Sequence, residues 1–333
     1  MTRIAIAGAG DAARRHAAVL GAINGAHLHQ LVAATRERSD PLAGAFGVTG
    51  GTYDQVRPDT DALVVATPAD ERVAVASAAM GLDIAVLVDS PIATSSGDAD
   101  ILIAAAATSA VASGCAEPVL FAPGVALGIE RCGSLGGLSH LSIRVLHQEA
   151  ATPPGGASDP TPTDAVWTVG HHAVALALAL NSPDTEAAIE ARITAGRDGS
   201  EEPIVVAQLT FASGLAAHLE LGLVSHAPIW DAQAASPTGV VRIELLPEPL
   251  VEVDGVDASA SPPHPVGERG SSPEHAAFAA LEAVGHVAML QGFADAVAGR
   301  GGRLCPLGFG RRVVAVLEAC DRSIGRGQPE RLQ

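Results

Sequence analysis

Residues 3–16 read RIAIAGAGDAARRH, and this stretch decides the fold. The apolar run Arg3–Ala7 is followed at once by two glycines and then by an alanine-rich segment. A short unbroken apolar run predicts a buried strand, and alanine favours the helix that comes next. The segment GAGDAA at residues 8–13 therefore predicts the tight strand-to-helix turn that binds the pyrophosphate of a dinucleotide.

Each position of this turn has a physical role. Gly8 permits the tight bend, and Gly10 lets the backbone approach the phosphates. Ala13 stands where a third glycine is usual and keeps the strand and the helix close together. Asp11 and Ala12 lie at the start of the helix, where the positive end of the helix dipole attracts a pyrophosphate. The alternative is a glycine turn that no longer binds a cofactor.

The end of the second predicted strand indicates which dinucleotide binds. An NAD site carries a carboxylate there, about 20 residues beyond the glycines, which accepts hydrogen bonds from the ribose. Here residues 34–38 read Ala-Thr-Arg-Glu-Arg. Thr35 is small and uncharged, and Arg36 and Arg38 can neutralise a 2′-phosphate, so the sequence favours NADP over NAD. The alternative is that both arginines only solvate a loop.

The rest of residues 1–118 continues the alternation of strand and helix. Further strands are expected at residues 28–34, 62–66, 84–88 and 110–113, and helices at 12–23, 70–80 and 97–108. Alternating strands and helices predict a parallel sheet, and strands that are apolar on both sides predict helices on both faces. We therefore expect residues 1–118 to form a doubly wound Rossmann domain.

The pattern changes after residue 118. Longer runs at residues 138–146, 188–195, 204–210, 215–223 and 240–246 alternate apolar with polar side chains. This alternation predicts an open, mainly antiparallel sheet, so we expect residues 119–333 to form an α/β domain. Two stretches rich in Pro, Gly and Ser, 152–163 and 257–273, are expected to be surface loops. Helices are expected at 274–298 and 308–324.

The composition excludes several kinds of partner. The 333 residues carry a formal net charge of -17, and all 20 cationic side chains are arginine. This charge argues against nucleic acid and anionic membranes, which bind clustered basic residues. No apolar run approaches the length of a membrane span. The four cysteines have no paired spacing, so we assign no disulfide and no metal, and free thiols fit the cytoplasm.

Several motifs, taken in order, resemble the Gfo/Idh/MocA family, which includes glucose-fructose oxidoreductases and inositol dehydrogenases. The resemblance covers nearly the whole chain. It is carried by GAGDAARRH with His16, DALVVATPADE, DSPIA in place of the usual EKPLA, FAPGVALGIERCGSLGGL, WTVGHH, LQGFADAVAGRG and RRVVAVLEACDRSIGRGQP. Each motif alone is weakly specific, whereas their order and spacing together are fairly specific.

The resemblance implies a nicotinamide cofactor in the first domain and a small-molecule substrate held between the domains. In such a site Thr67 and Pro68 lie over the cofactor, near its pyrophosphate and ribose. Asp89 and Pro91 would lie beside the nicotinamide. The resemblance also implies a homodimer or homotetramer formed through the open sheet of the second domain.

One departure from the family changes the expected chemistry. Relatives usually move a proton with the lysine of Glu-Lys-Pro and with an Asp-x-x-x-His pair. Here Ser90 stands at the lysine position, Thr168 at the aspartate position and His172 at the histidine position. Only His172 can give or take a proton near pH 7, so we expect it to act in catalysis or substrate binding, with Ser90 and Thr168 as hydrogen-bonding groups. The alternative is a structural histidine.

Three interpretations follow. The first is a reductase for a carbon centre that needs little acid help, such as an imine, an iminium ion or a conjugated C=C. The second is a carbonyl or sugar-type dehydrogenase whose proton relay is rebuilt from His172, Ser90 and Thr168. The third is a non-redox enzyme for elimination or ring closure, or a protein that binds a nucleotide or partner without turnover. NADPH-linked reduction in specialised metabolism is the favoured function.

Overall fold

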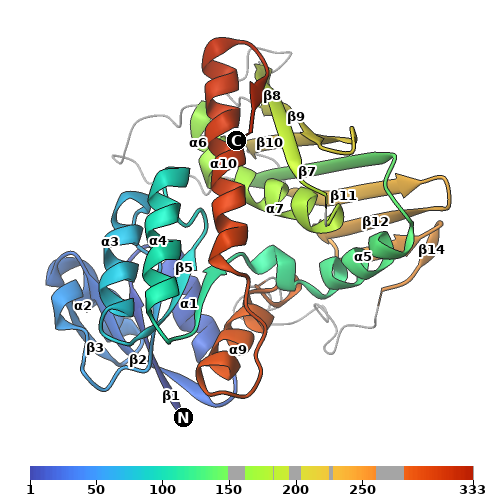
Figure 1. Ribbon diagram of the computed structural model, residues 1–333. Helices are drawn as coiled ribbons and strands as arrows, with labels where there is room; N and C mark the ends of the chain where they lie inside the picture. Colours follow the sequence, from blue (N-terminus) through green and yellow to red (C-terminus); the bar gives the residue numbers. More distant parts are fainter. Residues whose placement is uncertain (149–161, 183, 195–203, 225–227, 260–280, 333) are drawn as a thin grey trace. The chain divides into compact units, whose positions relative to one another are not determined.

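The computed structural model describes residues 1–148, 162–182, 184–194, 204–224, 228–259 and 281–332. The chain divides into two compact units, and each contains its own sheet (Figure 1). The first unit comprises residues 1–121 together with 267–314, and the second comprises 122–266 together with 315–333. The described residues from 281 to 314 thus pack with the N-terminal unit, although they come late in the chain.

The first unit is built on a six-stranded sheet in which all neighbouring strands run parallel. Its strands are β1 (Thr2–Ala7), β2 (Ala26–Ala33), β3 (Thr49–Thr52), β4 (Ala62–Val65), β5 (Ala85–Asp89) and β6 (Ser113–Ala116). Their order, β3-β2-β1-β4-β5-β6, is that of a doubly wound Rossmann sheet, so the predicted fold class is confirmed. The order reverses between β1 and β4, and ligands of such sheets bind outside the carboxyl ends of the strands at this point.

Four helices and a short turn connect these strands. They are α1 (Asp11–Leu20), α2 (Arg36–Ala45), the 3-10 turn η1 (Tyr53–Gln55), α3 (Ala69–Met80) and α4 (Ser96–Thr108). All four residues of β4 are buried, as are the apolar residues of β1. Burial of successive residues requires cover on both faces of the sheet, which explains why the sequence shows continuous apolar runs here.

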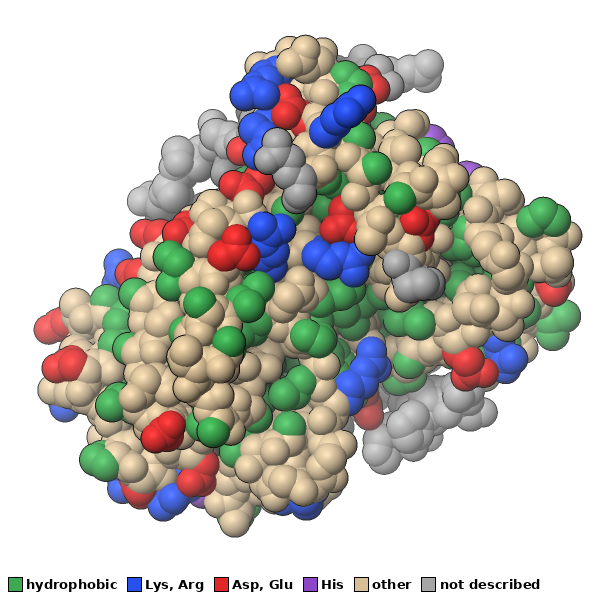
Figure 2. Space-filling model, viewed as in Figure 1, with side chains coloured by type: hydrophobic (Ala, Val, Ile, Leu, Met, Phe, Trp, Pro, Cys, Tyr) green, Lys and Arg blue, Asp and Glu red, His purple; other side chains and the backbone are tan. Residues whose placement is uncertain are grey.

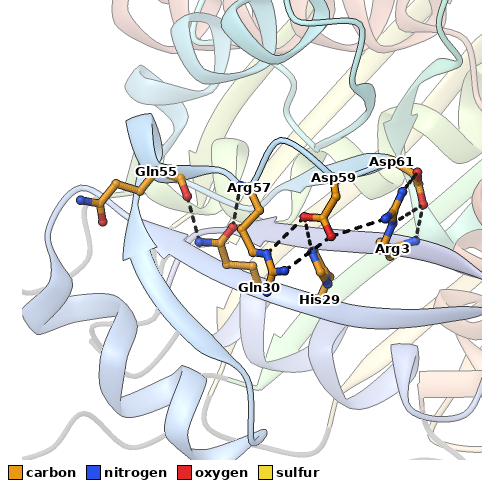
Figure 3. Close-up of polar contacts among 7 residues, drawn as sticks. All are labelled: Arg3, His29, Gln30, Gln55, Arg57, Asp59 and Asp61. Carbon is orange, nitrogen blue, oxygen red and sulfur yellow. Dashed lines mark hydrogen bonds and ion pairs between the residues drawn. The ribbon is translucent and has the colours of Figure 1, made fainter.

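The crossing from β3 to β4 has only one turn of 3-10 helix, and polar side chains fix it (Figure 3). Asp59 accepts hydrogen bonds from His29 at 3.1 Å and from Arg57 at 3.2 Å. Arg3, on β1, binds Asp61 with its Nη2 at 2.9 Å and its Nε at 3.2 Å. These contacts join the crossing segment to β1 and β2, where a longer helix would otherwise provide apolar packing.

The late segment of the first unit adds helical cover to the Rossmann sheet. It contains α9 (His286–Val297) and the first part of α10 (Leu307–Arg326). α9 packs against α1. The backbone N–H of Cys115 in β6 donates a hydrogen bond of 2.8 Å to the carbonyl of Cys305, just before α10. Residues separated by almost 200 positions therefore lie side by side in one core.

The second unit contains a nine-stranded sheet with the order β14-β13-β12-β11-β7-β10-β9-β8-β15. Its strands are β7 (His140–Gln148), β8 (Glu186–Thr194), β9 (Ile204–Phe211), β10 (Ala216–Val224), β11 (Ile229–Ser236), β12 (Gly239–Leu246), β13 (Leu250–Val253), β14 (Val256–Asp257) and β15 (Glu330–Arg331). β7 and β10 run parallel, and the other described neighbours run antiparallel. The predicted mainly antiparallel sheet is confirmed.

Helices pack on one face of this second sheet. They are α5 (Pro123–Ser134), α6 (Pro162–Thr168) and α7 (Gly170–Leu180). α5 lies on β12, and α7 lies on β7 and β10. A Cβ at Gly128 would come within 2.2 Å of Ile243, so glycine is what allows α5 to sit this close to β12. Buried and exposed residues alternate along β9, which shows that the opposite face of the sheet is open.

Some predicted segments lie outside the residues that the structure describes. The expected loops at 152–163 and 257–273, and the start of the helix expected at 274–298, lie largely outside the described residues. Among the described helices, none is both long and apolar enough to pass through a bilayer. On the face seen in Figure 2, acidic and basic side chains are interspersed with apolar ones.

Candidate functional site

The turn between β1 and α1 has the geometry that its glycines predict. Gly8 has a φ of 132°, and a Cβ there would lie 2.1 Å from the carbonyl oxygen of Ala66. Only glycine tolerates both conditions. Gly10 precedes α1, and nothing lies within 4 Å of the position that its Cβ would take. The chain itself therefore requires the first glycine, whereas the second leaves space open at the start of the helix.

The start of α1 fits the pyrophosphate of a dinucleotide. No side chain caps this helix, so the N–H groups of its first turn are left for a ligand. Ala13 is fully buried, which lets α1 pack closely on the sheet. Gly10, Asp11 and Ala12 would hold the pyrophosphate through their backbone, with the exposed Asp11 carboxylate turned to solvent.

The exposed segment after β2 is the position from which Rossmann domains contact the ribose of the adenosine. Thr35 is the residue before α2 and has an extended backbone. The backbone N–H of Glu37 and the side chain of Thr35 hydrogen-bond the Glu37 carboxylate and lower its pKa. Arg36 binds Gln55 at 3.0 Å, and Arg38 is exposed. A 2′-phosphate would find two guanidinium groups here but would have to displace the Glu37 carboxylate from the start of α2.

Tyr53 and Glu71 form a polar pair near the same end of the site, and the sequence analysis missed it. The Tyr53 hydroxyl donates a hydrogen bond of 2.6 Å to Glu71. Burial and this carboxylate together raise the pKa of Tyr53, whereas the charge of Arg38 acts to lower it. The two residues are 18 positions apart, and only Glu71 lies in one of the motifs, DALVVATPADE. The one available signal was that Tyr53 is the only tyrosine in the chain.

The turn after β4 is tied to the turn after β5 by an arginine. Thr67 is 2% exposed, and Pro68 directly precedes α3. Arg72, in the first turns of α3, donates its Nε to the Thr67 carbonyl at 3.0 Å and its Nη1 to the Pro91 carbonyl. Burial lowers the pKa of Arg72 while the charge of Asp89 raises it, and a guanidinium remains charged at pH 7 in either case.

Asp89, at the end of β5, forms a buried pair with His16 of α1. The His16 Nε2 and the Asp89 Oδ1 lie 2.9 Å apart. Burial acts to raise the pKa of Asp89, but the charge and hydrogen bond of His16, with the charges of Arg72 and His286, outweigh it and lower this pKa. The His16 ring also meets the His286 ring edge to face, with centroids 5.9 Å apart. Asp89 is therefore held as a carboxylate beneath several cationic or ionisable groups.

Ser90, at the position of the family's lysine, already has a partner. Its Oγ lies 3.0 Å from the Sγ of Cys115 in β6. The hydrogen bond with Cys305 and burial raise the pKa of the Cys115 thiol, so both groups stay neutral near pH 7. The peptide bond from Ser90 to Pro91 is cis. Neither the hydroxyl nor the thiol offers the proton that an ammonium group would.

In the second unit, His172 lies in an aromatic cluster. Its ring centroid is 4.8 Å from that of Trp230 in β11, and His147 approaches the same indole at 5.7 Å. The ring of His171 lies 3.8 Å from that of His172. Consecutive residues at the first turn of α7 thus contact each other through their rings. Thr168 is exposed at the end of α6.

The structure brings the predicted cofactor residues to one edge of the first sheet. Gly8, Thr35, Thr67 and Asp89 lie at or just beyond the carboxyl ends of four parallel strands. The predicted catalytic residues do not share one unit, because Ser90 belongs to the first, and Thr168 and His172 belong to the second.

Comparison with known proteins gives a family for this arrangement. Residues 2–114 match the model of the GFO_IDH_MocA oxidoreductase family, which has an NAD-binding Rossmann fold. This match covers the first domain of the chain. The predicted resemblance is confirmed, and so is the broad class of NAD(P)-dependent oxidoreductase. No curated protein matches the sequence.

Solved structures share the fold over almost the whole length of the chain. The myo-inositol dehydrogenase from Lactobacillus casei, in complex with NAD(H) and myo-inositol, has a TM-score of 0.79 at 16% identity, with 100% of this chain and 97% of that chain covered. GenD2 from gentamicin A biosynthesis, in complex with NAD, has a TM-score of 0.78 at 21% identity, with 100% and 96% covered. An oxidoreductase domain protein from Kribbella flavida has a TM-score of 0.81 at 20% identity, with both chains fully covered.

Proposed function

We propose that the protein is an NADPH-linked reductase that reduces a C=N, C=C or C=O group of a small molecule in specialised metabolism, without a catalytic lysine. The observation that carries the proposal is that the DSP segment, residues 89–91, offers no good proton donor at the position of the family's lysine. The Ser90 hydroxyl is hydrogen-bonded to the Cys115 thiol, and the nearby Arg72 guanidinium cannot release its proton at neutral pH. An imine or iminium substrate fits this site best because such a group needs little acid from the protein.

NADP is the cofactor that the adenosine end of the site favours. The end of β2 carries Thr35 in place of the usual acidic residue, with Arg36 and Arg38 exposed beside it. A 2′-phosphate pairs well with guanidinium groups. Glu37 opposes this preference through its charge, so we expect NADPH to bind more tightly than NADH by a modest factor. NAD is the second candidate cofactor, because the structurally similar GenD2 was solved in complex with NAD.

His172 is the group that we propose moves the proton. The bound cofactor would supply the hydride. The half-buried imidazole of His172 lies against Trp230, which limits its rotation, and it can hold or release a proton near pH 7. Thr168 and Ser90 have hydroxyl groups that can orient a substrate by hydrogen bonding, but they are poor acids.

A sugar-type or inositol-type dehydrogenase is the second candidate. It is favoured by the substrate of the Lactobacillus casei relative and by the UDP-N-acetylglucosamine 3-dehydrogenase from Acidithiobacillus ferrooxidans, which has a TM-score of 0.76 at 20% identity. In that case His172 would accept the proton of an alcohol. A non-redox reaction, such as elimination or ring closure, or binding without turnover, is the remaining alternative.

The open face of the second sheet is where we propose that copies of the chain associate as a dimer or tetramer. Strands that bury one face and leave the other to solvent offer a large flat surface for this purpose. The four described cysteines are free and buried, which fits the reducing cytoplasm as the proposed compartment.

Steady-state kinetics with two substrate classes test the proposed function. NADPH oxidation is measured with cyclic imines, and NADP reduction is measured with polyols and sugars at alkaline pH. We expect turnover with imines and a loss of about 10²-fold in kcat for His172→Asn, the contribution of one positioned acid. His27→Asn, on β2 of the first unit and outside the predicted site residues, is the control. Turnover of polyols alone would favour the second candidate, and cofactor binding without any redox turnover would favour a non-redox function.

A further inference from the structure

The DSP turn, residues Asp89–Pro91, is held by three different elements of the first unit. Its first residue binds His16 of α1 at 2.9 Å. The hydroxyl of its second residue lies 3.0 Å from the sulfur of Cys115 in β6. The carbonyl of its third residue accepts a hydrogen bond from Arg72 of α3. Three successive residues therefore have one long-range partner each, which leaves this turn little freedom to move.

The contact with His16 is unusual in its burial. His16 is 2% exposed at its side chain and Asp89 is 13% exposed. Taking a carboxylate and an imidazole out of water costs solvation energy that their attraction only partly returns, so a buried pair adds little net stability. What such a pair does provide is a fixed geometry, because removing either partner leaves the other buried and uncompensated.

The second ring nitrogen of His16 also indicates that this residue provides geometry rather than stability. Its Nδ1 is buried and has no hydrogen-bond partner among the described residues. An unsatisfied buried nitrogen is costly. A residue selected only for stability would be apolar at this position of α1. The hydrogen bond to Asp89 is therefore the one polar contact that the buried ring makes among the described hydrogen bonds.

We propose that His16 and Arg72 are positioning residues that hold the DSP turn as a rigid wall for the nicotinamide end of the bound cofactor. The proposal rests on the proposed cofactor function and adds the residues that shape the site beyond the pyrophosphate turn. β5 ends at the carboxyl edge of the sheet, where doubly wound domains bind their ligand. A wall that is fixed before binding reduces the entropy lost when the ring is immobilised.

Binding of a whole and a truncated cofactor separates this role from general stability. NADPH contains the nicotinamide, whereas 2′,5′-ADP carries only the adenosine end, so a positioning defect at the DSP turn should affect the first alone. We expect His16→Leu to weaken NADPH binding about tenfold in calorimetry, the size of one hydrogen bond to a charged group, and to change 2′,5′-ADP binding less than twofold. His16→Gln, whose amide can still donate to Asp89, should restore most of the NADPH affinity.

His27→Leu is the matched control for a lost histidine. His27 lies on β2 of the same unit, and its Nδ1 is also buried without a hydrogen-bond partner among the described residues. Its loss should leave the ratio of the two affinities unchanged. If His16→Leu weakens both ligands equally, or neither, the positioning role is wrong while the cofactor site stands. If the native protein binds neither ligand, both this proposal and the proposed function are overturned.

Arg72→Gln provides a second arm should His16→Leu fail to fold. This change removes the guanidinium that joins the carbonyls of Thr67 and Pro91, and Arg72 belongs to α3 rather than to α1. We expect the same selective loss for NADPH over 2′,5′-ADP. Equal affinities of the variant and the native protein for NADPH would overturn the proposal.

Discussion

The turns after β1 and after β5 lie at the same edge of one parallel sheet but are built differently. The first is nearly bare: Gly8 bends against the backbone of Ala66, Gly10 leaves open space, and no side chain caps α1. The DSP turn is held by side chains from three other elements. The first turn depends only on backbone, its own and that of Ala66, whereas the second depends on side chains that are far away in the sequence.

Gly8→Val should give the largest effect, because the first turn has no room for a side chain at Gly8. A Cβ would meet the Ala66 oxygen at 2.1 Å, at a φ of 132° that valine does not adopt. We expect a loss of about 4 kcal/mol in the free energy of unfolding, because backbone strain and overpacking add together here. Urea denaturation measures it, and Gly44→Val, with no neighbour within 4 Å, is the control. Equal stabilities of the two variants would show that the first turn is not sterically fixed.

Asp89→Asn should come next, because it removes the carboxylate charge from the buried contact with His16 and leaves the Arg72 guanidinium without this counter-charge. We expect a loss of about 3 kcal/mol in the free energy of unfolding at pH 7, as for other buried pairs that lose one partner. Denaturation of the native protein and of the variant across a pH series measures this difference.

The pH dependence of that difference has a definite sign. The pKa of Asp89 is lower in the folded protein than in the unfolded chain, with burial opposed and outweighed by His16. The stability that the carboxylate contributes is therefore complete above the unfolded pKa of about 4 and is lost as pH falls below it. If the difference in the free energy of unfolding between the native protein and Asp89→Asn grew on acidification, the stabilising role of the Asp89 carboxylate would be contradicted.

Tyr53→Phe should have the smallest effect and should confine it to the adenosine end. It removes one hydrogen bond of 2.6 Å to Glu71, at an expected cost of about 1 kcal/mol. NADPH and 2′,5′-ADP should lose affinity by the same factor, unlike the selective loss expected at the DSP turn. If Tyr53→Phe weakened the binding of NADPH but not of 2′,5′-ADP, Tyr53 would not act at the adenosine end of the site.

The ionisation of Tyr53 can also be followed directly, since it is the only tyrosine. Burial and the Glu71 carboxylate raise its pKa in the folded protein. A raised pKa means that this contribution to stability is present below the unfolded pKa of about 10 and is lost as pH rises above it. Absorbance titration should show phenolate only at more alkaline pH than in the urea-unfolded chain.

The sequence predicted the parts of the fold that depend on local patterns. The Rossmann strands other than β3 were found because continuous apolar runs show that both faces are covered, and β7, β8, β9, β10 and β12 were found from their alternation. β11 (Ile229–Ser236) and β13 (Leu250–Val253) of the second sheet were not expected. α2 and β3 were missed: α2 contains Pro41 and has few apolar residues, and β3 is the glycine-rich TGGT. The sixth strand was expected at 110–113, but it forms at Ser113–Ala116, where Cys305 offers a backbone partner that no local pattern reveals.

In the candidate site, too, features set by local sequence were predicted and features set by distant contacts were not. The pyrophosphate turn was predicted residue by residue, because glycine spacing and helix position define it. The partners of Asp89, Ser90 and Arg72 could not be predicted, since sequence spacing does not show that His16 and Cys115 approach the end of β5. Their roles, and those of His172 and Thr168, stay predictions.

Calorimetric titration of NADPH into the native protein and into Gly10→Asp tests the central claim, that the open turn before α1 holds a dinucleotide. The added carboxylate would enter the open space beside Gly10, where the pyrophosphate is expected. Gly44→Asp places the same charge on α2, in equally open surroundings, as the control. The account predicts tight binding to the native and Gly44→Asp proteins and none detectable to a folded Gly10→Asp. Unchanged binding to Gly10→Asp would contradict it.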